Sequence, residues 1–358
     1  PHTCVNPILY KRVNSKLLGC FFMPNVRKDP DVTCRHLQTE AEKHFRYQVS
    51  LRKVWLGRKK ALQQVYGDWY KSYNELPKLF AALKHSNLGT KVEWVLNHQP
   101  GTNTAHFNCV FWTFGPCVEA FKFCRPVLCI DGTFCYGKYK HTLLVAVSVD
   151  GNKQVVPIVF YSTPKETAEA WSFFLHCIKH HVVGHEREET ICLISDRGTR
   201  IISAVNNEDN GWQPPFAVHR FCIWHVCSNL NKEIKNHQVK KLVDAAAHQP
   251  KPRKFERYMS MMRDLSEDAI EWFNRTNQNG DTLLMKEQWT LAFDGFYRYR
   301  YMTNNIVESY NSVLKGARGL PVCAMVKKIF YSYVILWEKS LSTARENMQK
   351  DYMFTAQI

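Results

Sequence analysis

A run of apolar residues near the middle of the chain leads directly into an acid. Residues 127–130 are all apolar, as in a buried strand, and Asp131 follows them. Two more strand-like runs, residues 142–149 and 155–161, are separated by Asp150-Gly151, and an Asp-Gly pair is a strong hairpin signal. The pattern predicts a three-stranded antiparallel meander with Asp131 on its first strand.

Helices and strands alternate after this meander. The pattern predicts a helix over residues 166–182, a buried strand over 191–195 that ends in Asp196 and, after a further helix, a strand over 216–221. A strand–helix–strand crossover makes a strand parallel to its neighbour, and open sheets place ligand sites at the carboxyl ends of such strands. If the strands before Asp131 and Asp196 are neighbours, the two carboxylates lie side by side. The alternative is that each acid only caps the turn after its strand.

A helix near the C-terminal end carries a third acid. Val307, Tyr310 and Leu314 recur at helical spacing, and Glu308 lies on the opposite face. Two interpretations stay open for Glu308: it binds a metal ion, or it completes a helix capping box that Asn305 begins. The same polar face also carries Asn304, Asn311 and Lys315.

The periodicity divides the rest of the chain into helical and irregular parts. Residues 1–30 are basic and interrupted by prolines, which predicts a linker. Asp31 is the expected N-cap of the first helix of a small basic helical domain. The overall prediction is an α/β fold, a mixed sheet flanked by helices. The expected parts are the helical domain at 31–108, the first part of the core at 109–235, an all-helical insertion at 236–300, the last core helices at 301–345 and a tail at 346–358.

Composition narrows the classes of function. The chain has 358 residues, 45% of them hydrophobic, and a net charge of +16, so it can bury a full core and attracts polyanions, nucleic acid first. Its 13 cysteines are scattered through apolar runs, which is typical of reduced cysteines in the cytosol or nucleus. Since no apolar run approaches the about 20 residues that a membrane helix needs, we expect no membrane partner.

Several motifs occur in a fixed order along the chain, and such a set is far more specific than any one motif. They are Asp131-Gly132-Thr133-Phe134, Gly137-Lys138-Tyr139, Ser195-Asp196-Arg197-Gly198, Cys222-x-x-His225, Thr303-Asn304-Asn305-x-x-Glu308-Ser309-x-Asn311 and Lys315-Gly316-Ala317-Arg318. Together they resemble the transposases of plant Mutator-like elements, which belong to the DDE superfamily. The opening His2-Thr3-Cys4 is similar to the tail of the zinc-binding DNA-recognition domain that precedes the core in this family, so we expect such a domain before the linker.

The resemblance implies a ribonuclease H-like fold in which Asp131, Asp196 and Glu308 form the catalytic triad. Such a triad binds two Mg²⁺ or Mn²⁺ ions, about 3.5–4 Å apart, which activate the nucleophile and stabilise the leaving oxygen. The implied reaction is cut-and-paste transposition in the nucleus. The implied partners are double-stranded DNA, both the terminal inverted repeats and the target, and further copies of the chain in a homo-oligomer.

Two other classes of function stay open. A transposase-derived transcription regulator that has lost activity would keep the basic charge and the fold. A cellular nuclease on the same fold would need neither the Cys-x-x-His signature nor the long insertion. An intact triad favours the enzyme.

Cys222 and His225 match the family's Cys-x-x-His signature, which lies beside the active site. We expect His225 to orient an active-site carboxylate or a DNA phosphate, with Cys222 buried against it. His219 and Cys227 would complete a zinc tetrad on paper, but the run is too compressed for the usual paired spacing of ligands. We therefore expect no zinc in this segment.

Cations in the helical domain and in the motifs are the candidate DNA contacts, because Lys and Arg neutralise phosphates. One group is expected at the start of the second helix of the helical domain. The predicted contacts are Arg58, Lys59 and Lys60 in that group, and Lys138, Arg197, Lys315 and Arg318 in the motifs.

Overall fold

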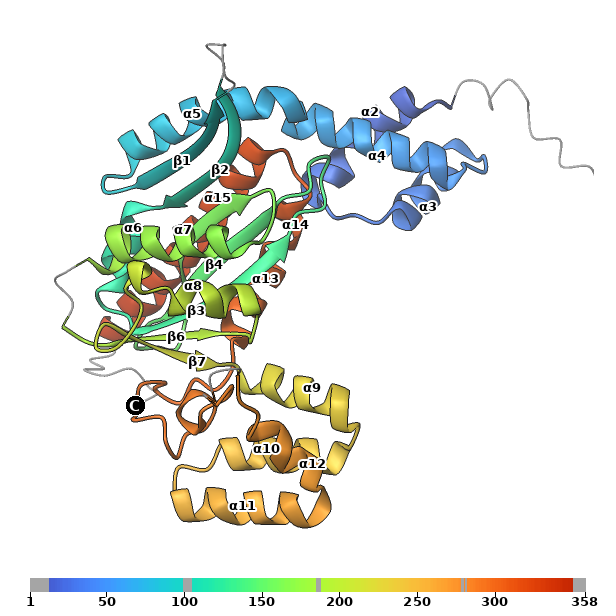
Figure 1. The fold of residues 1–358 in the computed structure, drawn as a ribbon. Helices are drawn as coiled ribbons and strands as arrows, with labels where there is room; N and C mark the ends of the chain where they lie inside the picture. Colours follow the sequence, from blue (N-terminus) through green and yellow to red (C-terminus); the bar gives the residue numbers. More distant parts are fainter. Residues whose placement is uncertain (1–12, 99–104, 185–187, 278–279, 281, 350–358) are drawn as a thin grey trace, which may run out of the picture. The chain divides into compact units, whose positions relative to one another are not determined.

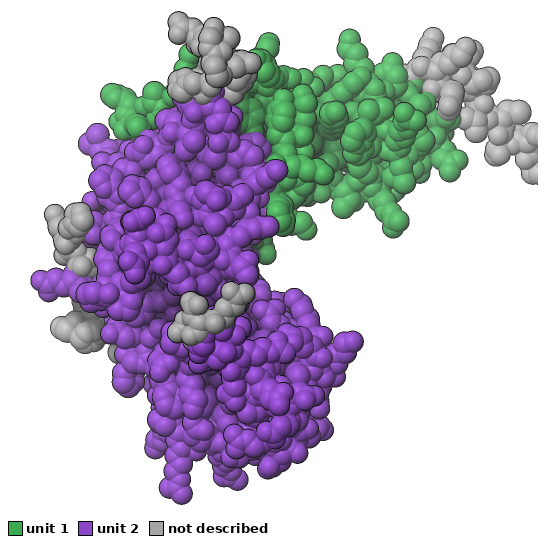
Figure 2. Space-filling model, viewed as in Figure 1, with its two compact units in different colours: residues 1–86, 134–140, 311–358 green, residues 87–133, 141–310 purple. Residues whose placement is uncertain are grey.

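The chain folds into two compact units, each assembled from separate stretches of sequence (Figure 2). The computed structural model describes residues 13–98, 105–184, 188–277, 280 and 282–349. Unit 1 comprises Pro1–Ser86, Phe134–Lys140 and Asn311–Ile358, and unit 2 comprises Asn87–Thr133 and His141–Tyr310.

Unit 2 is built on a mixed sheet, as the sequence predicts. Within the described residues the sheet has seven strands in the order β1-β2-β5-β4-β3-β6-β7. β1 pairs antiparallel with β2, β2 with β5 and β5 with β4, whereas β6 is parallel to both β3 and β7. The strands are β1 (Lys91–His98), β2 (Ala105–Thr113), β3 (Val127–Phe134), β4 (Thr142–Val149), β5 (Val155–Thr163), β6 (Ile191–Ser195) and β7 (Ala217–Phe221).

The predicted meander of β3, β4 and β5 is present. The Arg125 N–H donates to the Val149 carbonyl at 3.1 Å, so the chain entering β3 lies against the end of β4. At the turn between β4 and β5, one oxygen of Asp150 accepts from the backbone N–H groups of Asn152 and Gln154, both at 2.8 Å. This local bonding of an Asp side chain fixes the hairpin, as the Asp-Gly pair predicts.

One face of the sheet is covered by α6 (Gly115–Phe121), α7 (Ala168–Ile178) and α8 (Thr199–Asn206), as Figure 1 shows. Leu128 and Ile130 of β3 and Leu193 of β6 point into the core under these helices. Since successive side chains of a strand alternate between faces, Asp131 and Asp196 lie toward the opposite face. The sheet thus separates the two acids from this core.

Helices α9 to α12 surround a core of their own next to β7 (Figure 1). They are α9 (Ile223–Ile234), α10 (His237–Ala247), α11 (Pro252–Leu265) and α12 (Glu267–Phe273). The stretch predicted as helical to residue 300 is helical only to Phe273. Beyond it, the described residues up to α13 include the short 3-10 turn Lys286–Gln288 and an isolated antiparallel bridge between Thr276 and Thr282. Phe296, Tyr299 and Arg300 have φ of 68°, 48° and 70°, and a helix cannot hold such angles.

Residues 15–28, predicted as part of a linker, form a helix in unit 1, α2 (Ser15–Lys28). The Asn14 side chain caps it by accepting from two backbone N–H groups, at 2.9 and 3.0 Å. Pro24 lies inside the helix, although proline normally breaks one. Leu18 and Phe22 are fully buried, and a Cβ added to Gly57 of α4 would come within 2.7 Å of Leu18 Cβ. Close packing on α4 therefore stabilises α2 where local pattern alone favours irregular chain.

The predicted basic domain over residues 31–108 also differs from the structure. Its helical part ends at Ser86, and β1 and β2 belong to the sheet of unit 2. Thr33, not Asp31, caps α3, while the Asp31 carboxylate accepts from the Tyr136 hydroxyl at 2.9 Å. Residues 1–12, with His2-Thr3-Cys4, and 350–358 lie outside the described residues. The other helices are α3 (Cys34–Phe45), α4 (Leu51–Tyr66), α5 (Trp69–Ser86), α13 (Asn305–Val313), α14 (Lys315–Arg318) and α15 (Val322–Gln349).

Candidate active site

Asp131 lies on β3, and Asp196 directly follows β6, the parallel neighbour of β3. β3 pairs with β6 in a register that matches Leu128 with Leu193 and Cys129 with Ile194. Counting two residues further along each strand from the Cys129–Ile194 pair brings Asp131 level with Asp196. Neighbouring strands lie about 4.8 Å apart. The prediction that the two acid-bearing strands are adjacent and parallel is confirmed.

One carboxylate oxygen of Asp196 accepts a local hydrogen bond, and the other oxygen is separate from that bond. Its Oδ1 accepts from the Gly198 N–H at 2.9 Å, which is the turn-capping interaction weighed for it as an alternative. A carboxylate has about four lone-pair sites on two oxygens, so this bond leaves capacity for another ligand. Both Asp131 and Asp196 are half-buried. Capping and ligand binding are therefore compatible at Asp196.

Cys222 lies directly beside the end of β6. Its N–H donates to the carbonyl of Ser195, the residue before Asp196, at 2.8 Å. The side chain is fully buried at the start of α9, and this burial raises the pKa of its thiol, opposed by nearby backbone N–H groups that include that of Asn304. A buried, protonated thiol suits a packing role, as expected for this cysteine.

His225 and Glu308 face each other from two helices. Ile223 in α9 donates its N–H to the Met302 carbonyl at 2.9 Å, which ties the start of α9 to the segment before α13. His225 Nε2 then lies 3.9 Å from Glu308 Oε1, with side chains 26% and 41% exposed. The other ring nitrogen of His225 is buried without a partner among the described residues. The structure therefore brings His225 beside the third predicted acid.

The capping-box interpretation of Glu308 is wrong. It requires Asn305 as the N-cap, but Asn305 is already the first residue of α13. The carbonyl of Asn304 accepts from the Val307 N–H at 3.0 Å and from the Glu308 N–H at 3.1 Å, which makes Asn304 the N-cap. Glu308 is then one position too late for the box, whose acid stands three residues after the cap.

The polar face predicted for α13 is only partly exposed. Asn304 is fully buried and Asn311 is 7% exposed, while Glu308 is half-buried and Lys315 is exposed. Neither side-chain polar atom of Asn304 has a hydrogen-bond partner within the part of the chain that the structure describes. Buried amides are normally bonded, so Asn304 is a residue of this site whose importance the sequence pattern did not indicate.

Asp131 and Asp196 lie toward the carboxyl ends of β3 and β6, but the site residues do not form a closed metal site. Among the described residues, no group of three or more His, Cys, Asp or Glu side chains is arranged to hold a metal ion. His219 bonds to Ser195 Oγ at 2.8 Å, and burial, with the cations Arg298 and Arg220, lowers the pKa of His219 to about 3. Cys227 is part of the core around α9. That the segment holds no zinc stays a prediction.

A buried ion cluster joins β7 to the segment before α13, and sequence reasoning missed it. Asp294 Oδ1 lies 2.9 Å from Arg220 Nε and 3.5 Å from Arg298 Nε, and Oδ2 accepts from the Arg298 backbone N–H at 2.8 Å. All three residues are buried, and Arg298 also donates to the Phe221 carbonyl at 3.0 Å. The Asp294 carboxylate is therefore committed to two arginines. Arg220 is far from Asp294 in the sequence, so no local sequence pattern indicates that the two residues pair.

The predicted cations on α4 differ in their surroundings. They lie in the middle of this helix and not at its start. Arg58 is half-buried and donates to the Pro30 carbonyl at 2.7 Å, so it is engaged within unit 1. Lys59 is exposed over the Trp55 ring at 5.6 Å, and Lys60 is exposed with a 2.9 Å bond to Ser15 Oγ. Lys59 and Lys60 are thus the candidates for phosphate contact.

The cations of the motifs also fall into two kinds. Lys138 and Lys315 are exposed in unit 1, whereas Arg318 is half-buried there over the Tyr136 ring at 5.6 Å and donates to the Phe134 carbonyl at 3.4 Å. Arg197 in unit 2 is half-buried and stacks on Trp272 at 5.0 Å. Contact with DNA stays a prediction for all four.

Salt dependence tests the cations of α4. Changing Lys59 and Lys60 together to Gln is expected to reduce the slope of log Kd against log salt by up to about 2, because each phosphate contact contributes about one released counterion. Arg58 is not substituted, because losing its hydrogen bond to Pro30 would change folding as well as DNA binding. DNA affinity measured by fluorescence anisotropy between low and moderate salt gives the slope, and an unchanged slope would assign both lysines to solvation alone.

One comparison with known proteins gives a match over part of the chain. Residues 127–229 match the family model of the MULE transposase domain. The match supports a Mutator-like transposase. The matched span opens at β3 and ends in α9, so it contains Asp131, Asp196, Cys222 and His225 but not Glu308. No curated protein matches the chain. In the described residues no helix is long and apolar enough to cross a membrane.

Proposed function

We propose that the chain is a DDE-type DNA transposase with a ribonuclease H-like core. The order β5-β4-β3-β6-β7, a meander followed by parallel strands, supports such a core, with β1 and β2 extending the sheet. The helices between β7 and α13 are then the insertion that separates the last acid from the first two. The observation that carries the proposal is the β3–β6 register, which sets Asp131 level with Asp196 inside the matched domain.

The acids of the site suit divalent ions. Carboxylate oxygens are the hard ligands that Mg²⁺ and Mn²⁺ prefer, and Mg²⁺ keeps water and substrate oxygens in its remaining positions. Asp131 and Asp196 would hold the ions from neighbouring strands, and Glu308 would add its carboxylate from α13. When bound, two such ions would supply an activated water or hydroxyl and would stabilise the leaving oxygen of an in-line displacement at phosphorus.

His225 is the positioning residue of the proposed site. At 3.9 Å from Glu308 it can orient this carboxylate, and its charged form would strengthen the contact. Cys222 fixes the start of α9, the helix that carries His225, against the end of β6 through its backbone N–H. Cys222 therefore acts through packing and not through its sulfur.

The proposed partner is double-stranded DNA, as terminal inverted repeats and as target. A net charge of +16 supports binding to this polyanion, and exposed lysines such as Lys59 and Lys60 are available for phosphates. A transposase acts on genomic DNA, so the proposed location is the nucleus. Joining two element ends calls for a homo-oligomer in the DNA complex. We also propose that the chain comes from a plant element, as the resemblance implies.

Replacing Asp196 with Asn tests the proposal directly. Asn keeps an oxygen that accepts from the Gly198 N–H, so the turn and the melting temperature should be retained. The change removes a charged ligand, and losing even about 3 kcal/mol of transition-state stabilisation slows cleavage by at least about 100-fold. The measurement is Mg²⁺-dependent cleavage of labelled DNA together with thermal melting.

Asp209→Asn is the matched control for this test, because it removes one exposed acid elsewhere in unit 2. It is expected to cleave like the parent. If the Asp196→Asn protein also cleaves like the parent, the role of Asp196 is limited to capping the turn after β6. A parent protein that binds DNA but cuts none with Mg²⁺ or Mn²⁺ would favour the transcription regulator instead.

A further inference from the structure

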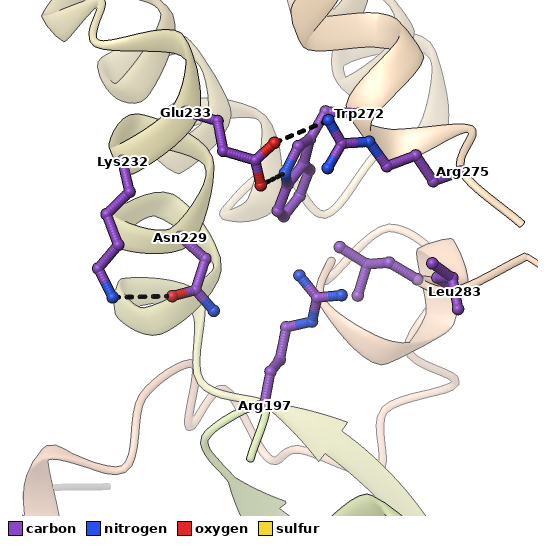
Figure 3. A pocket seen from close by; sticks show the side chains of 8 residues that line it. Arg197, Asn229, Lys232, Glu233, Trp272, Arg275 and Leu283 are labelled. Carbon is purple, nitrogen blue, oxygen red and sulfur yellow. Dashed lines mark hydrogen bonds and ion pairs between the residues drawn. The ribbon is translucent and has the colours of Figure 1, made fainter. Parts of the chain in front are cut away.

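A pocket opens beside the proposed active site in unit 2 (Figure 3). It has a volume of about 310 Å³, at the lower end of the range for small-ligand sites, about 300–1,000 Å³. Arg197 enters it from the end of β6, Lys232 and Glu233 from α9, and Trp272 and Arg275 from α12 and the residues after it. The site is thus built by segments from three parts of the chain.

The lining of this pocket is cationic. Its acid, Glu233, is already bonded to Arg275 at 2.7 Å and to the Trp272 indole N–H at 2.9 Å. Arg197, Lys232 and Arg275 carry three positive charges against the single negative charge of Glu233. The pocket therefore attracts an anion.

The guanidinium of Arg197 is preorganised to bind such an anion. Its guanidinium lies 5.0 Å from the Trp272 ring and 5.8 Å from the Phe221 ring. Burial lowers the pKa of Arg197, opposed by Glu233, and its Nε is buried without a hydrogen-bond partner in the described chain. A guanidinium that is desolvated and stacked loses little freedom when it binds a phosphate, so binding is strengthened.

The other wall of the pocket is apolar. Trp272 contributes its ring, and Leu283 is 49% exposed at the lining. Figure 3 shows the guanidinium of Arg197 below Trp272, between Leu283 and α9. A ligand with both an anionic group and a flat apolar ring would satisfy the two walls, whereas inorganic phosphate would leave the apolar wall unused.

The position of the pocket relates it to the acids. Arg197 directly follows Asp196 in the chain. On α9, His225, Asn229 and Lys232 are spaced i, i+4 and i+7, so they share one face, and four residues of helix rise about 6 Å. The pocket therefore begins one helical turn from His225, within reach of a nucleotide adjoining a phosphate at the acids.

We propose that this pocket binds one unpaired nucleotide of the DNA strand next to the cleavage site. Its phosphate would contact Arg197, Lys232 and Arg275, and its base would lie against Trp272 and Leu283. Aromatic rings bind bases of any sequence by stacking, which suits a site that receives whatever nucleotide adjoins the cut. Two parts of this proposal rest on the proposed function: that the polymer is DNA and that the nucleotide adjoins a cleavage site.

The test compares two DNA probes on the full chain. One is a blunt duplex, and the other is the same duplex with a short single-stranded extension that carries 2-aminopurine at successive positions. The parent protein is expected to bind the extended duplex about tenfold more tightly and to quench 2-aminopurine at one position most, as stacking of one base predicts. The double variant Lys232→Gln/Arg275→Gln should lose this preference and the quenching.

Arg253→Gln/Lys254→Gln is the matched control, because it removes one Arg and one Lys that are exposed on α11 and do not line the pocket. The control should bind both probes more weakly and keep the preference. The proposal is overturned if the pocket variant keeps the preference, or if the control loses it equally. It is also overturned if a polyglutamate peptide displaces the extension as well as a single-stranded oligonucleotide does.

Cleavage assays of the same proteins separate this proposal from the proposed function. A protein that cuts DNA while the pocket variant keeps the preference would lack the nucleotide site and still be a transposase. A protein that never cuts DNA, but whose preference depends on Lys232 and Arg275, would have the nucleotide site without the enzyme.

Discussion

Replacing Glu308 with Gln is expected to abolish Mg²⁺-dependent DNA cleavage while the melting temperature stays that of the parent. Glutamine has the shape of glutamate but lacks the charge that a hard divalent ion requires. Because Asn304 and not Asn305 caps α13, the capping box that could have explained this glutamate does not exist. A loss of at least about 100-fold in cleavage rate, or about 3 kcal/mol, is expected when a ligand carboxylate is removed.

The control for Glu308→Gln is Glu267→Gln, which removes an exposed glutamate from the first turn of another helix, α12. This control should cleave DNA at the parental rate. A Glu308→Gln protein that cleaves like the parent would remove Glu308 from the proposed triad. It would also leave His225, which faces Glu308 at 3.9 Å, without its proposed role.

Replacing Asp294 with Asn is expected to lower the free energy of unfolding of unit 2 by about 3–5 kcal/mol, because it leaves two buried arginines without their carboxylate. The shape of the side chain is nearly kept, so the loss reports charge and not packing. Asp294 is 1% exposed, and its Oδ1 lies 2.9 Å from Arg220 Nε. Urea unfolding, followed by intrinsic fluorescence and by circular dichroism, measures the effect.

Asp244→Asn is the control for this charge effect. Asp244 lies on α10 in the same unit, and its side chain is 59% exposed beside His248 at 3.6 Å. An exposed ion pair of this kind contributes between about 0 and 1 kcal/mol, so the control should unfold nearly like the parent. Equal unfolding curves for the two variants would show that the buried arginines are stabilised by other groups.

Local pattern was enough for the strands at the centre of unit 2. The apolar runs before Asp131 and Asp196 predict β3 and β6, and the Asp150-Gly151 pair predicts the hairpin between β4 and β5, because burial and turn chemistry are properties of short segments. The order of the motifs likewise indicated the transposase domain that residues 127–229 match. Which acids to examine was therefore readable from the sequence.

Local pattern failed where distant contacts outweigh it. Pro24 indicates a break, yet α2 runs through it because Leu18 and Phe22 are buried against α4. The sequence predicts that residues 91–98 belong to a helical domain, yet Lys91–His98 forms β1, since β2 offers it an antiparallel partner along its whole length. In both segments the partner lies elsewhere in the chain, so a window of sequence does not contain it.

The sequence by itself determined which residues carry acids at the ends of buried strands and in which order they occur. Only the tertiary structure decided that β3 and β6 are neighbours in a register that makes Asp131 level with Asp196, and that His225 faces Glu308. It alone also paired Asp294 with Arg220, 74 residues away. The physical reason is that propensity and turn chemistry act between residues close in sequence, whereas strand register and the pairing of buried charges depend on which segments share a core.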